Sequence, residues 1–575
     1  MISVLIKKEM HRFLEEAKLA CDFLFGTLGY EYRYINREDE LRRNEILFIY
    51  GVLEPTRDEM YEMALQRIAF FIPLQPDLLQ PGKLNRDQIR EMIREIKYLR
   101  HTPLLAGRDL ESPLYYYKNN DIFFGKYNFD LLGNIFFHLV NYEYYSIEAR
   151  DKFDRVSDNM SAFAEYGQFP FINTLLWLVE ETVKDALTER ADYLLLKKDY
   201  WPGGQPYAAA LSHNVESLRK WTFGSILKST FTDLLIFYKI RYIIRNISRK
   251  VRYIATNIEE YWNFDIISEI EQEQGVKSTF FFIMEKEPGQ ITDYSPVDRD
   301  ILEEVQTLMK TDYEIALLAS LESSRTDAIR KQKETLLDIT EEHKIGVRQS
   351  RNRLEPDVTP QYHNKYDFYY DSSLGFCETN GFKNGFGFPV QQVITGKEER
   401  GKFRFSNGQC LELPLVFSDG NLILSKARQV GYEQARSSLE FLISLLNKFN
   451  GFLGVNFSVH NFAELTYDNQ LYMQLLNKLK ADNAYIGRFR DLASWWRKRR
   501  AIRMAEDSSE IRINFPEAVQ SMCFLLFGQF QVNQVEGAKA EIMGNRIFLR
   551  EIATGKTVIL RLNRQRRQPD EVDNA

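Results

Sequence analysis

From Tyr207 to about Trp496, short apolar segments alternate with longer amphipathic ones along the chain. Buried parallel strands carry few polar residues because helices cover both faces of their sheet, whereas the connecting helices keep one polar side. The alternation therefore predicts an α/β unit over residues 201–500, in which helices connect parallel strands. The strand candidates are Tyr207–Leu211, Lys277–Ile283, Tyr313–Ala319, Ile345–Val347, Cys410–Phe417 and Phe452–Val459.

Further units flank this one on both sides. Residues 1–200 mix strand-like runs such as Glu45–Tyr50 with helical runs such as Asn85–Arg100, which predicts an N-terminal α+β domain. The turn-forming cluster Trp201–Pro206 marks the end of this domain. Residues 501–562 alternate polar and apolar side chains, which predicts a small antiparallel β appendage, and the polar residues 563–575 predict a disordered tail.

Composition and charge narrow the classes of partner. The 575 residues, of which 44% are apolar and 27% charged, are typical of a folded protein with several domains. A net charge of −6 argues against nucleic acid as a partner, because no overall positive field attracts a polyanion. The basic run Arg497–Arg500 is compatible with phosphate contact, but a solvated helix end more often explains such a run. Four widely separated cysteines indicate neither a zinc knuckle nor a disulfide framework.

No segment has the pattern of a membrane or export signal. Charges interrupt Met1–Gly26 every few positions, so we expect no secretory signal and a cytoplasmic location. The most apolar later stretch, Phe223–Ile244, contains Lys228, Asp233, Lys239 and Arg241, which are too many charges for a bilayer span. Its spacing favours an amphipathic helix, and we expect no transmembrane segment.

A series of short motifs occurs in order along the chain. In the predicted α/β unit these are Leu211–Ser217, Gly275–Ile283, Glu314–Ser320, Gly346–Gln349, Tyr370–Phe376, Leu411–Leu415 and Ser458–Asn461. The series resembles the polysaccharide deacetylase family, carbohydrate esterase family four. In particular, it is similar to a bacterial branch whose first motif reads S/T-H-D-V-D and whose third reads E-I-G-L-H. Phe129–Phe137 and Asp151–Arg155 resemble the accessory region that precedes such barrels.

The resemblance implies a fold and a chemistry. The fold is a distorted, incomplete (β/α) TIM-like barrel with its reactive residues at the carboxyl ends of the strands. The chemistry is removal of an N- or O-acetyl group from a carbohydrate. A metal polarises the carbonyl group and activates water, a carboxylate acts as base, and a late histidine protonates the leaving group.

Carried over residue by residue, the resemblance gives an incomplete catalytic set. Asn214 occupies the base position, Glu216 the metal-carboxylate position, Leu318 the metal-histidine position and His460 the acid position. An amide does not accept a proton near neutral pH, and an aliphatic side chain has no lone pair for a metal. None of the seven histidines is paired at i, i+3 or i, i+4, and His213, next to Asn214, is expected to point to the opposite face as a structural residue.

Other residues complete the predicted site. Arg348 matches the arginine that orients the catalytic carboxylate in the family, and we expect it to meet Glu216, a ligand or a plain structural ion pair. Asp419 is expected to orient the ring of His460. Aromatic rings and polar groups for a sugar pocket are predicted at Trp221, Tyr369, Tyr370 and Asn461.

Three functions are compatible with these residues. The preferred hypothesis is a degenerate family member that has lost its metal site, needs no cofactor and binds a glycan or a protein partner. The first alternative is an active deacetylase with an atypical site for zinc or another divalent metal, in which Glu216 is a ligand and His460 the acid. The second is a structural interaction protein whose pocket is vestigial.

Overall fold

The structure is a computed structural model of the whole chain. It describes most residues; the gaps lie at 220–258, 286–291, 398–402, 426–427, 463–466 and 565–575, with shorter ones at 43, 53–55, 66, 97–98, 107–109, 120–121, 191 and 508. Trp221, the apolar stretch Phe223–Ile244 and nearly all of the predicted tail lie outside the described residues. Among the helices that are described, none combines the length and the apolar character needed to cross a bilayer.

The N-terminal sheet has the strand order β2-β1-β3-β4-β8-β7. Its strands are β1 (Ile2–Ile6), β2 (Tyr32–Ile35), β3 (Ile46–Val52), β4 (Ile68–Pro73), β7 (Leu114–Asn119) and β8 (Ile122–Tyr127). The helices of this part are α1 (Leu14–Leu28), α2 (Arg57–Met63), α3 (Arg86–Met92), α4 (Leu131–Leu139) and α5 (Phe171–Glu189). A small pair, β5 (Ile93–Arg94) and β6 (Leu104–Leu105), follows α3.

Two expectations for this part need correction. The prediction of an α+β arrangement was wrong, because β1, β2, β3, β4 and β8 pair in parallel and only the edge strand β7 is antiparallel. Parallel neighbours need crossover connections, and α1 and α2 supply them between β1 and β2 and between β3 and β4. The helix expected over Asn85–Arg100 ends at Met92, because Ile93 is extended and pairs with Leu105.

The central sheet has the strand order β15-β16-β14-β13-β12-β11-β10-β20-β17, and β21 pairs with the start of β10. Its strands are β10 (Ala208–Val215), β11 (Thr279–Phe282), β12 (Glu314–Ala319), β13 (Gly346–Gln349), β14 (Tyr370–Asp371), β15 (Val390–Lys397), β16 (Phe403–Glu412), β17 (Leu415–Ser418), β20 (Phe452–Asn456) and β21 (Tyr485–Gly487). The helices are α8 (Phe264–Gln274), α9 (Arg299–Lys310), α10 (Ala328–Thr340), α11 (Thr359–Lys365), α12 (Tyr432–Lys448), α13 (Asp468–Ala481) and α14 (Phe489–Ala501). β18 (Ile423–Ser425) and β19 (Arg428–Gln429) form a separate hairpin.

The pairing of the central sheet confirms the predicted parallel strands. In the strand order given above, each pair of neighbours from β16 through β14 to β17 is parallel. The described sheet has one antiparallel pair, β15 with β16. One isolated parallel bridge joins Gly375, just after β14, to Leu415 of β17. This bridge places the segment just after β14 next to β17.

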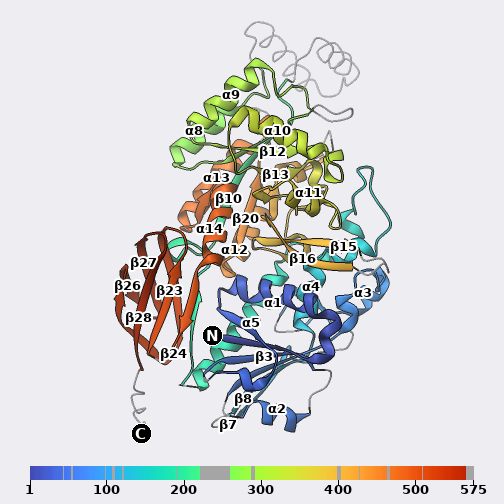
Figure 1. Cartoon of the computed structure of the whole chain (residues 1–575). Coiled ribbons are helices and arrows are strands. Elements are labelled where there is room, and N and C mark those ends of the chain that lie inside the picture. The colour runs from blue at the N-terminus through green and yellow to red at the C-terminus, as the bar shows by residue number, and fades with distance from the viewer. Residues whose placement is uncertain are drawn as a thin grey trace.

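The C-terminal strands form two four-stranded sheets, with the orders β22-β23-β28-β25 and β26-β27-β24-β9. They are β22 (Arg503–Glu506), β23 (Glu510–Phe515), β24 (Val519–Gly528), β25 (Phe530–Glu536), β26 (Lys539–Met543), β27 (Arg546–Ile552) and β28 (Lys556–Arg564), with β9 (Leu194–Lys198) from the N-terminal half. All pairs are antiparallel, as predicted. In Figure 1 they lie to one side, while the central sheet and its helices lie above the N-terminal sheet.

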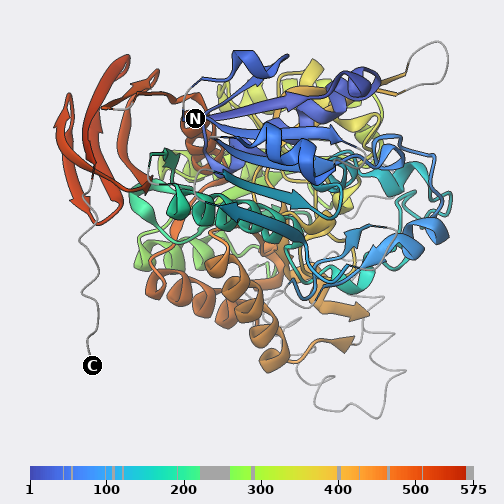
Figure 2. The same cartoon turned by 90° about the horizontal axis from the view of Figure 1, so that it is seen from below.

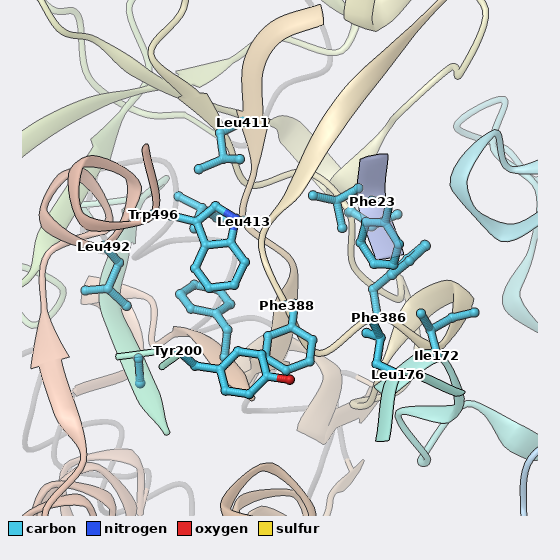
Figure 3. Packing of buried hydrophobic residues seen from close by; sticks show 14 of the residues in the cluster. Phe23, Ile172, Leu176, Tyr200, Phe386, Phe388, Leu411, Leu413, Leu492 and Trp496 are labelled. Atoms are coloured by element: carbon cyan, nitrogen blue, oxygen red, sulfur yellow. The ribbon is translucent and has the colours of Figure 1, made fainter. Parts of the chain in front are cut away.

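A continuous apolar core joins these parts. Figure 2 shows the N-terminal sheet in blue against the central elements, and Figure 3 shows the side chains between them. Phe23 of α1 packs edge-on against Phe386, with ring centroids 5.4 Å apart. Phe388 stacks on Tyr200 at 4.9 Å and on Trp496 of α14 at 6.0 Å. The core therefore fixes the segment 386–388 and helix α14 against elements of the N-terminal half.

Candidate functional site

Four side chains from neighbouring strands share one face of the central sheet. Asn214 of β10 lies opposite Phe281 of β11, and Leu318 of β12 lies opposite Arg348 of β13. Successive strand residues point to opposite faces. Phe281 pairs with Ala316, and Leu318 is two residues further along β12, so Phe281 and Leu318 point to the same face. The structure thus brings together the positions that the motif series assigned to the base, the metal histidine and the arginine.

Arg348 organises this cluster. Its guanidinium donates to Asn214 Oδ1 at 2.8 Å, to Asn456 Oδ1 at 3.0 Å and to Ser372 Oγ at 3.1 Å. The guanidinium carbon lies 4.0 Å from the centre of the Phe281 ring. Burial lowers the pKa of Arg348 to about 10, against the opposing effect of Tyr370 and acidic neighbours, so it remains charged at pH 7. Its hydrogen bonds go to neutral groups, and within the described part of the chain it forms no ion pair.

The family's metal positions do not supply a donor set. Glu216 follows β10 and is half-buried. Its carboxylate is the one anionic group at the two metal positions, because the other position holds Leu318. Leu318 is 1% exposed and offers no lone pair where a histidine would be needed. In the part of the chain that the structure describes, no three His, Cys, Asp or Glu side chains are arranged to hold a metal ion. The residues at these positions therefore do not fit a histidine-bound zinc ion.

His460 lies in a short 3-10 helix, Val459–Phe462, directly after β20. Its ring is half-buried, its centre lies 5.6 Å from that of Tyr261, and its buried Nδ1 has no hydrogen-bond partner among the residues that the structure describes. Asp419 was predicted to orient this ring. Its Oδ2 instead accepts from the backbone N of Ser458 at 2.6 Å and from Asn461 Nδ2 at 2.8 Å. Asp419 and Asn461 thus hold the loop that carries His460.

His213 has the structural role that its position predicted. The ring is fully buried on the face opposite Asn214, with Nδ1 2.8 Å from the carbonyl oxygen of Phe457 and Nε2 3.1 Å from Glu271 Oε1. The Tyr472 hydroxyl donates to the same carboxylate oxygen. The imidazole is therefore satisfied inside the protein.

Two of the predicted aromatic residues, Tyr369 and Tyr370, do not join the cluster around Asn214. Tyr370 is fully buried and donates to Glu314 Oε1 at 2.8 Å, at the amino end of β12. Tyr369 precedes β14, and its carbonyl oxygen accepts from Arg497 at 2.6 Å. Both tyrosines are therefore placed toward the end of the sheet opposite to Asn214, and Trp221 lies outside the described residues.

A pocket that the sequence did not predict lies between α4 and the loops after β13 and β14. We call it the inter-unit pocket; its cavity volume is about 90 Å³, or about 990 Å³ when the open space at its mouth is included. Its apolar wall consists of Phe137, Phe163, Phe171, Phe376, Phe382 and Leu354. Lys383 and Asp158 add charges, with Nζ 3.5 Å from Asp158 Oδ1. Its lining comes from two distant stretches of sequence, 137–171 and 352–384, so no local motif marks it.

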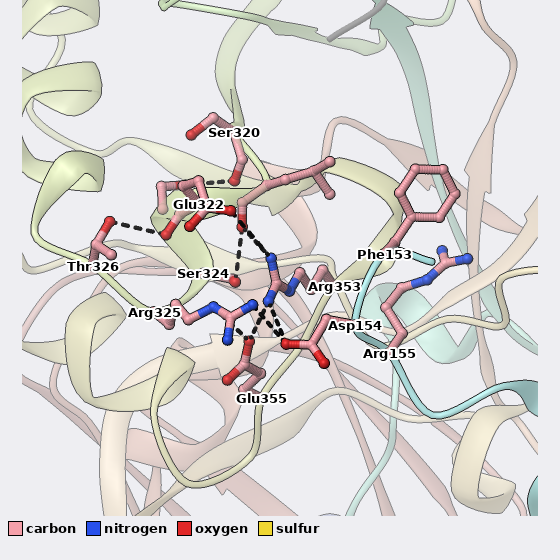
Figure 4. Close-up of polar contacts among 12 residues, drawn as sticks. Phe153, Asp154, Arg155, Ser320, Glu322, Ser324, Arg325, Thr326, Arg353 and Glu355 are labelled. Atoms are coloured by element: carbon pink, nitrogen blue, oxygen red, sulfur yellow. Dashed lines mark hydrogen bonds and ion pairs between the residues drawn. The ribbon is translucent and has the colours of Figure 1, made fainter. Parts of the chain in front are cut away.

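Charged side chains at one side of this pocket connect the N-terminal elements to the central loops (Figure 4). Asp154 Oδ2 lies 2.6 Å from Arg325 Nη2 and 3.1 Å from Arg353 Nη2. Arg353 also contacts Glu355 at 3.1 Å. Asp154 belongs to the segment Asp151–Arg155, which resembles the accessory region named in the sequence analysis. That segment therefore anchors the pocket wall.

Replacing Asp154 by asparagine should weaken this anchor only modestly. The Asp154 side chain is 49% exposed and Arg353 keeps Glu355, so we expect a loss of about 0.5–1 kcal/mol in the free energy of unfolding. Urea unfolding monitored by circular dichroism would measure the loss. Glu303→Gln, which breaks the exposed pair with Arg299, is the matched control. A loss above 2 kcal/mol would contradict the view that Asp154 is one of several redundant contacts.

Comparisons with known proteins give partial likenesses. The chain matches no protein-family model and no curated protein. Among solved structures, a Mycobacterium smegmatis protein provisionally named a polysaccharide deacetylase is 16% identical, with a TM-score of 0.35, over 52% of this chain and 92% of that one. PuuE allantoinase is 13% identical, with a TM-score of 0.32, over 52% and 92% of the two chains. Agd3, described as a novel carbohydrate deacetylase, is 7% identical, with a TM-score of 0.37, over 98% of both chains.

Proposed function

We propose that the central sheet is the incomplete TIM-like barrel of a deacetylase-like protein that has lost metal-dependent hydrolysis and binds a glycan. The ordered motif series and the bridge between Gly375 and Leu415 support the barrel. The hydrogen bond from Arg348 to Asn214 carries the functional half of the proposal.

Asn214 is unsuited to act as a base. Metal-assisted deacetylation needs a group that takes a proton from the attacking water. Asn214 Oδ1 is an amide oxygen that already accepts from the Arg348 guanidinium at 2.8 Å. A neighbouring cation makes protonation of that oxygen still less favourable. No proton acceptor is therefore available at the family's base position.

A resident divalent ion is disfavoured at the same place. It would meet the buried positive charge of Arg348, and like charges repel strongly where water is excluded. Glu216 alone would have to compensate this repulsion, because Leu318 provides no donor atom. The local charge balance therefore favours a protein without a metal ion at this place over one that binds the ion in an altered position.

The inter-unit pocket is the place we assign to the glycan. Sugar rings present apolar faces that pack on aromatic side chains, together with hydroxyl groups that bind charged ones. The pocket offers Phe376 and Phe382 beside Lys383 and Asp158. It opens next to the loops at the carboxyl ends of β13 and β14, where barrel proteins bind their ligands.

Acetate release tests the loss of hydrolysis. We expect the full chain, supplied with zinc or cobalt, to release no more acetate from acetylated oligosaccharides than buffer does. Metal analysis of the purified protein is expected to show no stoichiometric zinc. Acetate release that a chelator abolishes would overturn this half of the proposal.

Glycan binding is tested by calorimetric titration with acetylglucosamine oligomers. Phe376→Ala removes a half-exposed ring of the pocket and should weaken binding at least fivefold. Trp177→Ala, which removes a ring that is 42% exposed on α5, should leave the affinity unchanged. Equal affinity of the wild type and Phe376→Ala, or no binding by the wild type to any oligomer tried, would refute the assignment.

A further inference from the structure

The basic run singled out in the sequence forms part of a second pocket, at the junction of the N-terminal, central and C-terminal parts. This basic pocket is lined by Lys198, Arg497, Arg500 and Arg503, with Tyr32 and Glu517 among its other residues. Its cavity volume is about 420 Å³, or about 980 Å³ when the open space at its mouth is included. Arg497 binds the carbonyl oxygen of Tyr369, just before β14, so the pocket lies away from Asn214 and the strand carboxyl ends.

One neighbouring arginine shows what a purely structural role looks like in this region. Arg499 is fully buried, and its guanidinium donates to the backbone carbonyl oxygens of Asp199 at 2.7 Å, Thr27 at 2.9 Å and Lys198 at 2.9 Å. Its hydrogen-bonding capacity is thus used within the fold. It adds positive charge behind the pocket wall without taking a carboxylate partner.

The arginines of the pocket are satisfied much less completely. The side chain of Arg500 is half-buried and makes no hydrogen bond or ion pair with the described residues. Arg497 uses Nη2 for two carbonyl oxygens, while its buried Nε has no partner in the described part of the chain. Arg503 is exposed, and among the described residues its side chain donates only to the backbone oxygen of Arg500, at 2.9 Å. Guanidinium groups without anions, gathered in one cavity, are the chemistry of an anion site.

The nearby carboxylates Asp22, Glu31 and Glu517 offset this charge only in part, because four cations line the pocket, namely Lys198, Arg497, Arg500 and Arg503. Asp22 Oδ1 accepts from the hydroxyls of Tyr32 and Tyr34, each at 2.7 Å, and Glu31 is 3.2 Å from Lys198. Glu517 also lines the pocket, but it is exposed and its ion pair is with Lys498, at 4.0 Å. Positive charge therefore exceeds negative charge locally, although the chain as a whole carries −6.

We propose that the basic pocket binds a small molecule that bears a phosphate or pyrophosphate group. Planar guanidinium forks match phosphate oxygens, and several of them together suit a ligand with more than one negative charge. The cavity lies at a junction of three parts of the chain, and its volume of about 420 Å³ is in the range of sites for small molecules. This site is separate from the inter-unit pocket and does not depend on the proposed glycan function.

Calorimetric titration of the full chain with sodium pyrophosphate, and separately with inorganic phosphate, at low ionic strength tests the proposal. We expect saturable binding of pyrophosphate, tighter than that of phosphate, with an affinity that falls as salt is added. Arg500→Gln should weaken pyrophosphate binding at least tenfold. Arg330→Gln, on the exposed surface of α10, should not change it.

A second variant keeps the test valid if Arg500→Gln fails to fold. Arg503 is exposed, so Arg503→Gln should fold normally and weaken pyrophosphate binding several-fold. The absence of saturable pyrophosphate binding, or equal affinity in both variants and the wild type, would overturn the proposal. Tighter binding of citrate than of pyrophosphate would overturn the assignment to phosphate.

Discussion

Trp201→Ala is expected to lower the free energy of unfolding by about 3–5 kcal/mol, the range for removal of a large buried aromatic ring. Trp201 is fully buried, and its ring centre lies 5.3 Å from that of Trp496 and 6.3 Å from that of Phe452. Its Nε1 donates to the carbonyl oxygen of Asn450 at 2.8 Å. The variant therefore loses apolar contacts in the shared core and one hydrogen bond, and urea unfolding followed by circular dichroism would measure the loss.

The chain provides a matched control for this experiment. Trp177 on α5 is 42% exposed, so Trp177→Ala should change the free energy of unfolding by less than about 1 kcal/mol. If both tryptophan variants unfold at the same urea concentration, Trp201 does not have the packed environment that the structure assigns to it.

Lowering the pH from 7 to 5 should destabilise the wild type by about 2 kcal/mol through His138 alone. Burial lowers the pKa of His138 to about 3, whereas the unfolded chain has a value near 6.5. The folded state then binds fewer protons, so this contribution is complete above about pH 6.5 and is lost as the pH falls toward 3. The rate of loss is about 1.4 kcal/mol per pH unit.

His138→Phe isolates this effect. Aromatic rings surround the imidazole, with centroid distances of 4.7 Å to Phe163 and 4.9 Å to Phe171, so a phenyl ring suits the site. We expect the stability of this variant, relative to the wild type, to rise by about 2 kcal/mol between pH 7 and pH 5. His343→Gln, at an exposed position, is the control. A difference that stays constant between the two pH values would mean that His138 is not buried in its neutral form.

The sequence predicted most parallel strands of the central sheet, but it did not predict the short strand β14 or the parallel pairing of the N-terminal sheet. β10, β11, β12 and β20 appear as apolar runs because they are buried on both faces. β14 is two residues long, too short for any periodic pattern to mark it. The parallel order of the N-terminal sheet depends on which strands pair, and the composition of the individual strands does not contain that information.

The candidate site divides in the same way. The positions of Asn214, Leu318 and Arg348 followed from motifs at strand ends, and parallel pairing brings such ends together. The sequence did not show whether Arg348 would pair with a carboxylate. In the structure its guanidinium binds Asn456 of β20 and Ser372, which follows β14, and both are neutral. The inter-unit pocket was not predicted, since its two lining stretches meet only through tertiary packing. The sugar-binding roles assigned to Tyr369, Tyr370 and Asn461 stay predictions, and none of the pockets described above is lined by these residues.

The place of β9 has a consequence for synthesis of the chain on the ribosome. This strand precedes the central sheet in the sequence but pairs with β24, which follows it. The edge of β9 that pairs with β24 therefore has no partner until β24 has been translated. A nascent chain halted after α14 would leave that edge free to pair with another extended segment, as unpaired strand edges do.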